Sequence, residues 1–168
     1  MEENYYVHNA GMVLLWPYLG MLFERAGLTS NGEFPDNEAR QQAVLLLEFI
    51  VSEDENPGDD KLLFNKFLCG YPLDAPITVS LQMDENLEQL CSGLLEAVIS
   101  SWTILGNTSI TGLRETFLLR EGILNFNEDN TDLRVTIKPY DILLDQLPWS
   151  LSPVKLSWIQ QNLIVYWR

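Results

Sequence analysis

Basic residues are scarce in this chain. Only 10 of its 168 residues are Lys or Arg, against 24 Asp or Glu, which gives a formal charge of −14 at pH 7. The excess lies in residues 1–105, with 17 acids and 4 bases, whereas residues 106–168 hold 7 acids and 6 bases. A field of this sign repels phosphate backbones and anionic lipids, which argues against nucleic-acid and membrane-surface binding. Two interpretations remain open, a solvated acidic face or a basic protein partner.

Long apolar runs are also lacking. The first one, residues 12–23, is shorter than the roughly 20 residues that a membrane-spanning helix needs, and Glu2 and Glu3 lie where a secretory signal would be basic. We therefore expect no membrane segment and no signal peptide. The two cysteines, Cys69 and Cys91, lie among apolar neighbours, which favours buried reduced thiols over a disulfide.

The residue patterns that carry catalysis or bind metals are missing as well. His8 is the only histidine, and its Asn and Gly neighbours are typical of a turn. Ser109 lacks the flanks of a nucleophile elbow and is better explained as a helix cap. The acidic loop at residues 52–60 lacks the alternating ligands of a calcium loop, and no phosphate-binding glycine motif occurs. The sequence therefore predicts no cofactor, no metal site and no enzymatic activity.

One long amphipathic helix is the clearest positive signal. Apolar residues recur at spacings of three and four from Leu87 to Trp102, with polar residues between them. The corner Asn107, Thr108 and Ser109 follows and restarts a shorter helix, which Gly122 is expected to end.

Shorter helices precede it. Residues 17–26 begin with a proline suited to a first turn, and residues 37–51 follow a capping Asp36. The second of these is apolar on nearly all sides, so it should be the central helix. Residues 61–69 form a third, closed by Gly70.

The end of the chain alternates like strands. Leu133, Val135 and Ile137 should face one side, and residues 123–126 should pair with them as a hairpin with an acidic tip. Residues 5–7, 154–158 and 163–168 are further strand candidates, the last too apolar for an exposed edge. Residues 140–147 suggest a helical turn.

These elements predict an α+β class. The helical N-terminal two-thirds should pack with a small antiparallel sheet at the C-terminal end. With 46% apolar residues, residues 1–168 can bury roughly 70% of their surface as one domain. Residues 1–105 would form its acidic, mainly helical part, and residues 106–168 a helix and the antiparallel strands.

Blocks of sequence along the chain carry a family resemblance. They are NAGMVLLWP at residues 9–17, LFERAGL at 22–28, NKFLCGYPL at 65–73, LLEAVI at 94–99, NTS at 107–109, GLRETFL at 112–118, REG at 120–122, LPWS at 147–150 and the VYW ending at 165–167. In this order they resemble the conserved C-terminal region of the tape measure proteins of bacterial contractile injection systems.

The resemblance implies a structural protein of a phage-tail-like particle. In such particles the tape measure sets the length of the inner tube during assembly. Family members are generally longer than this chain, so we expect either an excised domain or a short stand-alone relative. Even as one continuous helix, 168 residues would span only about 250 Å, and the Gly and Pro breaks exclude such a rod.

These expectations give two hypotheses. In the first, the chain is the folded anchor of a tape measure, which binds inner tube, hub, spike or cap proteins and can form a homo-oligomer with its own copies. It would be in the bacterial cytoplasm during assembly and afterwards inside the particle. In the second it is a free acidic accessory protein, an assembly chaperone or adaptor. The corner Asn107, Thr108 and Ser109 is a candidate protein contact, together with Trp149 and Trp158, whose rings suit either a core or an interface.

Overall fold

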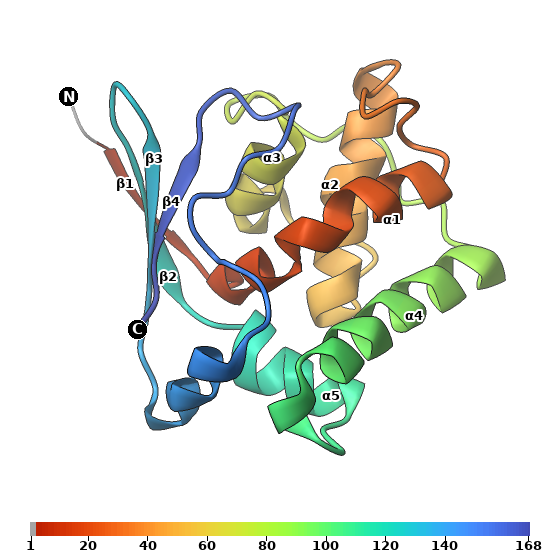
Figure 1. Ribbon diagram of the computed structural model, residues 1–168. Coiled ribbons are helices and arrows are strands. Elements are labelled where there is room, and N and C mark those ends of the chain that lie inside the picture. Colours follow the sequence, from red (N-terminus) through yellow and green to blue (C-terminus); the bar gives the residue numbers. More distant parts are fainter. Residues whose placement is uncertain (1–2) are drawn as a thin grey trace.

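A four-stranded mixed sheet forms one side of the molecule (Figure 1). The computed structural model describes residues 3–168. In sheet order the strands are β1 (Glu3–Val7), β2 (Gly122–Phe126), β3 (Thr131–Val135) and β4 (Leu163–Tyr166). β1 is antiparallel to β2 and β2 to β3, whereas β4 runs parallel to β3.

The α+β class is confirmed, but the predicted arrangement fits only roughly. The sheet is not confined to the C-terminal end, because β1 supplies one of its edges, with Glu3 opposite Phe126. It is not wholly antiparallel either. The chain passes through η5 (Pro139–Gln146) and a long loop between β3 and β4, and a connection of that length allows parallel pairing.

The predicted strand at residues 154–158 is wrong. Val154 forms only an isolated bridge with Leu163, and the residues after it are loop. This segment has another use, because it covers the outer edge of β4. The Ser152 hydroxyl accepts the Val165 N–H at 2.9 Å, and Val154 and Leu163 exchange two backbone hydrogen bonds. The apolar last strand is thus an edge in the sheet order, but its backbone is partly paired.

The two faces of the sheet differ as a half-buried sheet requires. Leu124, Leu133 and Val135 point to the core and are buried, whereas Arg134 lies on the outer face. Ile137, predicted to share the buried side with Leu133 and Val135, is 63% exposed because β3 ends at Val135.

The α-helices lie on the inner side of the sheet (Figure 1). The helical elements before η5 are η1 (Ala10–Tyr18), α1 (Leu19–Arg25), α2 (Asn37–Ser52), η2 (Asp59–Lys61), α3 (Leu63–Cys69), α4 (Glu85–Ser101), η3 (Thr103–Leu105), α5 (Ile110–Leu113) and η4 (Arg114–Leu118).

Local capping explains the helix boundaries that the sequence predicts well. The Asp36 carboxylate accepts the Ala39 N–H at 2.8 Å and begins α2, as expected. Gly70 adopts the left-handed conformation that ends α3. Asp84 accepts the Leu87 N–H at 2.7 Å, so α4 begins two residues before the predicted start.

Two boundaries differ from the prediction. The first helical segment begins at Ala10 rather than Pro17, because η1 is a 3₁₀ helix that continues into α1. Gly122 does not end a helix. The preceding helical segment, η4, ends at Leu118, and Gly122 opens β2, where an added Cβ would lie 2.5 Å from the Ala10 side chain.

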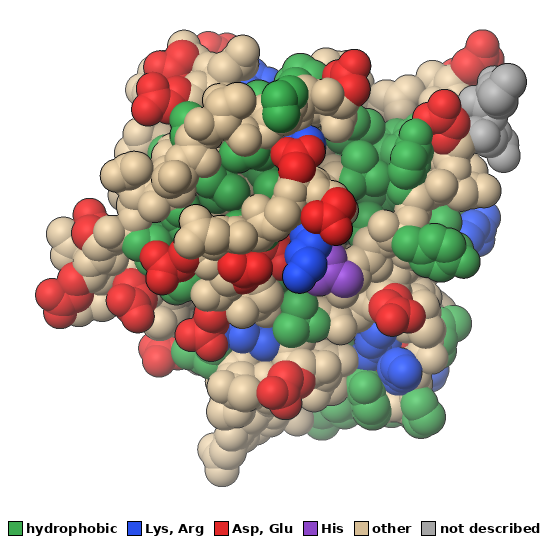
Figure 2. All heavy atoms as spheres, turned by 180° about the vertical axis from the view of Figure 1, so that it is seen from behind, with side chains coloured by type: hydrophobic (Ala, Val, Ile, Leu, Met, Phe, Trp, Pro, Cys, Tyr) green, Lys and Arg blue, Asp and Glu red, His purple; other side chains and the backbone are tan. Residues whose placement is uncertain are grey.

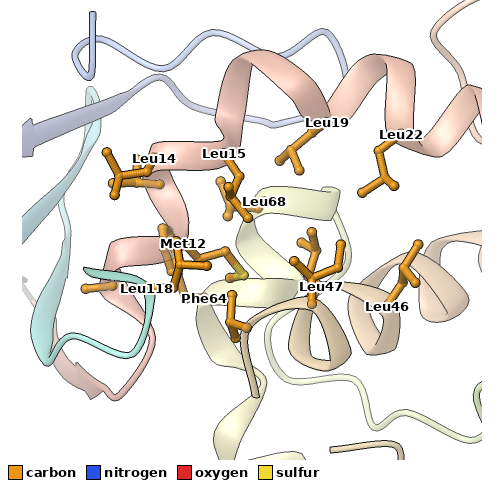
Figure 3. Packing of buried hydrophobic residues seen from close by; sticks show 14 of the residues in the cluster. Met12, Leu14, Leu15, Leu19, Leu22, Leu46, Leu47, Phe64, Leu68 and Leu118 are labelled. Carbon is orange, nitrogen blue, oxygen red and sulfur yellow. The ribbon is translucent and has the colours of Figure 1, made fainter. Parts of the chain in front are cut away.

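The core lies between η1, α1, α2 and α3 (Figure 3). Met12, Leu15 and Leu19 point from the first helical segment toward Leu47 of α2 and Leu68 of α3. Residues 43–51 of α2 are all buried, so its predicted central position is confirmed. Burying aliphatic and aromatic side chains in this way is the main source of the stability of the fold.

Candidate interaction surface

The corner after α4 is built by helix capping. Gly106 turns the chain with a φ of 57°, and the Thr108 hydroxyl donates to the Leu105 carbonyl at 2.6 Å. The Ser109 hydroxyl accepts the Gly112 N–H at 3.0 Å, which confirms its predicted role as the cap of α5. Asn107 and Ser109 remain exposed.

This corner borders a shallow hollow, which we call the corner hollow. It is lined by Glu96, Ile99 and Ser100 from α4 and by Gly106 and residues 108–111. The surface therefore combines two isoleucine side chains with hydroxyl groups and one carboxylate. It can contact a partner chain through both apolar and hydrogen-bonding groups.

The two candidate tryptophans have internal partners. The Trp149 indole N–H donates to the Leu14 carbonyl at 3.1 Å, and its ring meets Tyr18 edge-on at 5.4 Å. The Trp158 indole N–H donates to the Leu68 carbonyl at 2.7 Å. Both rings are half-buried, so each fastens the C-terminal loop to the helices and leaves part of its edge exposed.

The structure does not join these candidates into one site. Within residues 3–168, no hydrogen bond or ring contact links the corner Asn107–Ser109 to Trp149 or Trp158. Trp158 lies instead in an aromatic cluster with Phe23 and Phe34. Their role in contacting a partner stays a prediction.

The sequence interpretation missed a buried polar network around Glu48 of α2. This side chain is 1% exposed, and its Oε2 lies 2.8 Å from His8 Nε2 and 2.9 Å from the Ser52 hydroxyl. Its Oε1 accepts N–H groups from Asn9 at 2.9 Å and Asn65 at 3.3 Å. His8 is therefore more than the turn residue that its neighbours suggested. A charge inside an otherwise apolar stretch of α2 was the available signal, because buried charges need partners.

Those partners decide the state of the carboxylate. Burial alone would raise the pKa of Glu48, but the hydrogen bonds from His8, Ser52 and Asn65 lower it below its ordinary value. Because both oxygens are occupied, Glu48 is not poised as a general base. The network ties the segment after β1 to α2 and α3.

A second buried network fixes the end of the chain. Arg120 and Asp141 form a two-point ion pair, and the Trp167 indole N–H donates to Asp141 at 2.9 Å. Burial would raise the pKa of Asp141, but the Arg120 guanidinium, the Lys138 N–H and the Trp167 N–H hold it below its usual value. The Trp167 ring also lies beside the guanidinium, 5.3 Å from ring centre to Cζ.

Comparison with known proteins supplies the family. The family model for contractile injection system tape measure proteins matches residues 1–167. The chain belongs to this family. No curated protein and no solved structure matches it. Membership in the tape measure family means a structural role alongside other components of the injection particle.

The two cysteines of this tape measure chain are buried. Cys69 and Cys91 are free buried thiols, and burial raises the pKa of Cys91 to about 12. Neither is therefore an activated nucleophile. Over residues 3–168 there is no group of His, Cys, Asp and Glu arranged to hold a metal ion. Within the same residues, no helix has the length and apolar character to cross a membrane.

Proposed function

We propose that the chain is the folded C-terminal anchor of a tape measure, the part that holds the ruler to one end of the inner tube. The observation that carries this proposal is the family match over residues 1–167, within which residues 3–167 fold into helices and a sheet. A folded domain of this kind can offer a surface to other proteins.

Dimensions argue that this part is not itself the ruler. Its longest helix, α4, has 17 residues and spans about 26 Å at 1.5 Å per residue. The strands have four or five residues each. A length-setting role would need an extended segment, whereas an anchor needs only a folded unit with a binding face.

The partners of the anchor are inner tube, hub, spike or cap proteins, and copies of the chain could meet around the axis of the tube. The charge supports a partner with basic surface. Figure 2 shows acidic side chains scattered over one face of the molecule with fewer basic ones among them. The anchor would act in the cytoplasm during assembly and then stay within the particle.

Binding measurements test the anchor. The full chain is mixed with purified inner tube, hub, spike and cap proteins, and each pair is followed by calorimetry or surface plasmon resonance. An anchor binds one component of the tube end. Binding to none of them would overturn the proposal.

The excess of acid in residues 1–105 favours one alternative, a free accessory protein that shields partners during assembly and then leaves. Mass spectrometry of purified particles separates the two functions. The anchor stays in the particle at a few copies, whereas a chaperone or adaptor is present during assembly and absent from the finished product.

A further inference from the structure

An apolar groove lies between α1 and α4. Figure 1 shows both helices on the side of the molecule away from the sheet. It is lined by Tyr18, Met21 and Leu22 from the first helical segment and by Leu90, Gly93 and Ala97 from α4. Met21 is 48% exposed, so an apolar side chain stands uncovered at its rim. With about 290 Å³ the groove is at the lower end of small-molecule sites, which suits a few side chains of another protein better than a free ligand.

Gly93 is the unusual residue of this groove. Glycine in the middle of a helix destabilises it relative to alanine. Packing within the chain does not call for a glycine here, because an added Cβ at position 93 would meet nothing within 4 Å. The residue is exposed, and because it has no side chain, the backbone of another protein can approach the backbone of α4 closely at this position.

The charges beside the groove are asymmetric. α4 carries exposed carboxylates at Glu85 and Glu96, each one helical turn from a groove residue, Gln89 and Gly93 respectively, and it has no basic residue. Within residues 3–168 neither carboxylate takes part in an ion pair. On the α1 side of the groove lies one cation, Arg25. A partner that fits must therefore bring positive charge to the α4 side.

We infer that this groove binds an amphipathic helix of a particle protein, with its apolar stripe between α1 and α4 and Lys or Arg residues along the flank that faces α4. The uncovered apolar lining supplies the attraction, Gly93 permits close approach, and the carboxylates of α4 set the orientation. This inference rests on the proposed function for the source of the helix, but the binding chemistry of the groove can be tested by itself.

Filling the groove is the direct test. Gly93→Leu places a side chain in it from a position where an added Cβ meets nothing within 4 Å, and leucine favours the helix over glycine. Gly20→Leu is the matched control, because position 20 is equally clear of neighbours and does not line the groove. Both variants should melt no lower than the parent. Affinity for the tube, hub, spike or cap protein that binds the parent should fall about tenfold or more in Gly93→Leu and stay unchanged in Gly20→Leu.

The outcomes separate the two proposals. If a particle protein binds the parent and Gly93→Leu equally well, the groove is not its site and the anchor function stands. If the two lysines of a Glu85→Lys, Glu96→Lys variant strengthen rather than weaken binding, the assigned charge of the partner is wrong. A concentration-dependent dimer that Gly93→Leu abolishes would show that the occupant is a second copy, which also overturns the inference.

A synthetic probe tests the groove when no particle protein binds. Two helical peptides with the same leucine stripe are compared, one with Lys on one flank and one with Glu there. The lysine peptide should bind the parent and perturb the NMR signals of α1 and α4, and Gly93→Leu should remove that binding. Equal binding of both peptides, or signals that move elsewhere, would overturn the inference.

Discussion

Arg120 and Asp141 form a bidentate ion pair in the interior, with Nη1–Oδ2 at 2.6 Å and Nη2–Oδ1 at 2.8 Å. Arg120 is 3% exposed and Asp141 is fully buried. The guanidinium also donates to the carbonyls of Thr116 and Thr136. One side-chain pair thus connects η4, the end of β3 and η5.

Arg120→Met should destabilise the fold by about 3–5 kcal/mol, because it leaves the Asp141 carboxylate buried without its cation. Urea denaturation measures the change. Asp145→Asn is the control, since it breaks an exposed Arg168–Asp145 pair and should leave the midpoint nearly unchanged. Similar midpoints for the two variants would show that the buried pair does not hold the end of the chain.

The chain should lose stability in acid. The folded state lowers the pKa of both Glu48 and Asp141, so the unfolded chain takes up protons first as the pH falls. Their stabilisation is complete well above about pH 4 and is lost as the pH drops through that value and below it. Urea unfolding between about pH 7 and pH 2 measures how steeply the free energy of unfolding falls with pH. Glu48→Gln removes one titrating group, so a slope as steep as that of the parent would contradict the role of Glu48.

Gly11→Ala should destabilise the fold by about 3 kcal/mol or prevent folding. Its Cβ would lie 1.6 Å from the Phe117 carbonyl oxygen, so η1 and η4 would have to move apart. Gly93→Ala, which meets no neighbour, should instead stabilise the fold by about 0.5–1 kcal/mol. Thermal melting of both variants measures the two changes in stability. A Gly11→Ala variant as stable as the parent would contradict the close packing of η1 against η4.

Asn107→Lys should reduce binding to the particle component that the parent recognises and leave unfolding unchanged. Asn107 is exposed beside the corner hollow, so a long cation there would obstruct a contact without disturbing the core. Calorimetry gives the affinity and denaturation gives the stability. Unchanged affinity would remove the corner Asn107–Ser109 from the contact surface.

The helices were predictable where a local signal sets a boundary. Asp36 begins α2 and Gly70 ends α3 through hydrogen bonds to residues at most four positions away. Both partners of each hydrogen bond are therefore close together in the sequence. The apolar stripe from Leu87 to Trp102 likewise predicts α4 because helical periodicity is a property of one segment.

Pairings across the chain could not be predicted in the same way. No local pattern reports that β1 lies beside β2, or that β4 runs parallel to β3. Alternation at residues 154–158 resembled a strand, but the main-chain groups of Val154 bridge only to Leu163.

Among the candidate contact residues, too, local contacts were predictable from the sequence and contacts between distant residues were not. The capping role of Ser109 followed from its place before a helix, because the donor is the nearby Gly112 N–H. Nothing in the sequence showed that the indole of Trp158 would reach the Leu68 carbonyl. Whether these residues contact another protein depends on surfaces that one chain does not contain.

The position of β1 has a consequence for synthesis on the ribosome. Its partner strand β2 lies far along the chain, with Val7 opposite Gly122, so β1 leaves the ribosome long before the strand that pairs with it. Closing so long a loop is slow and is the kind of step that limits folding rates. A nascent chain that stalls before Gly122 would therefore carry β1 without its partner strand, and we expect it to need protection there until β2 has been translated.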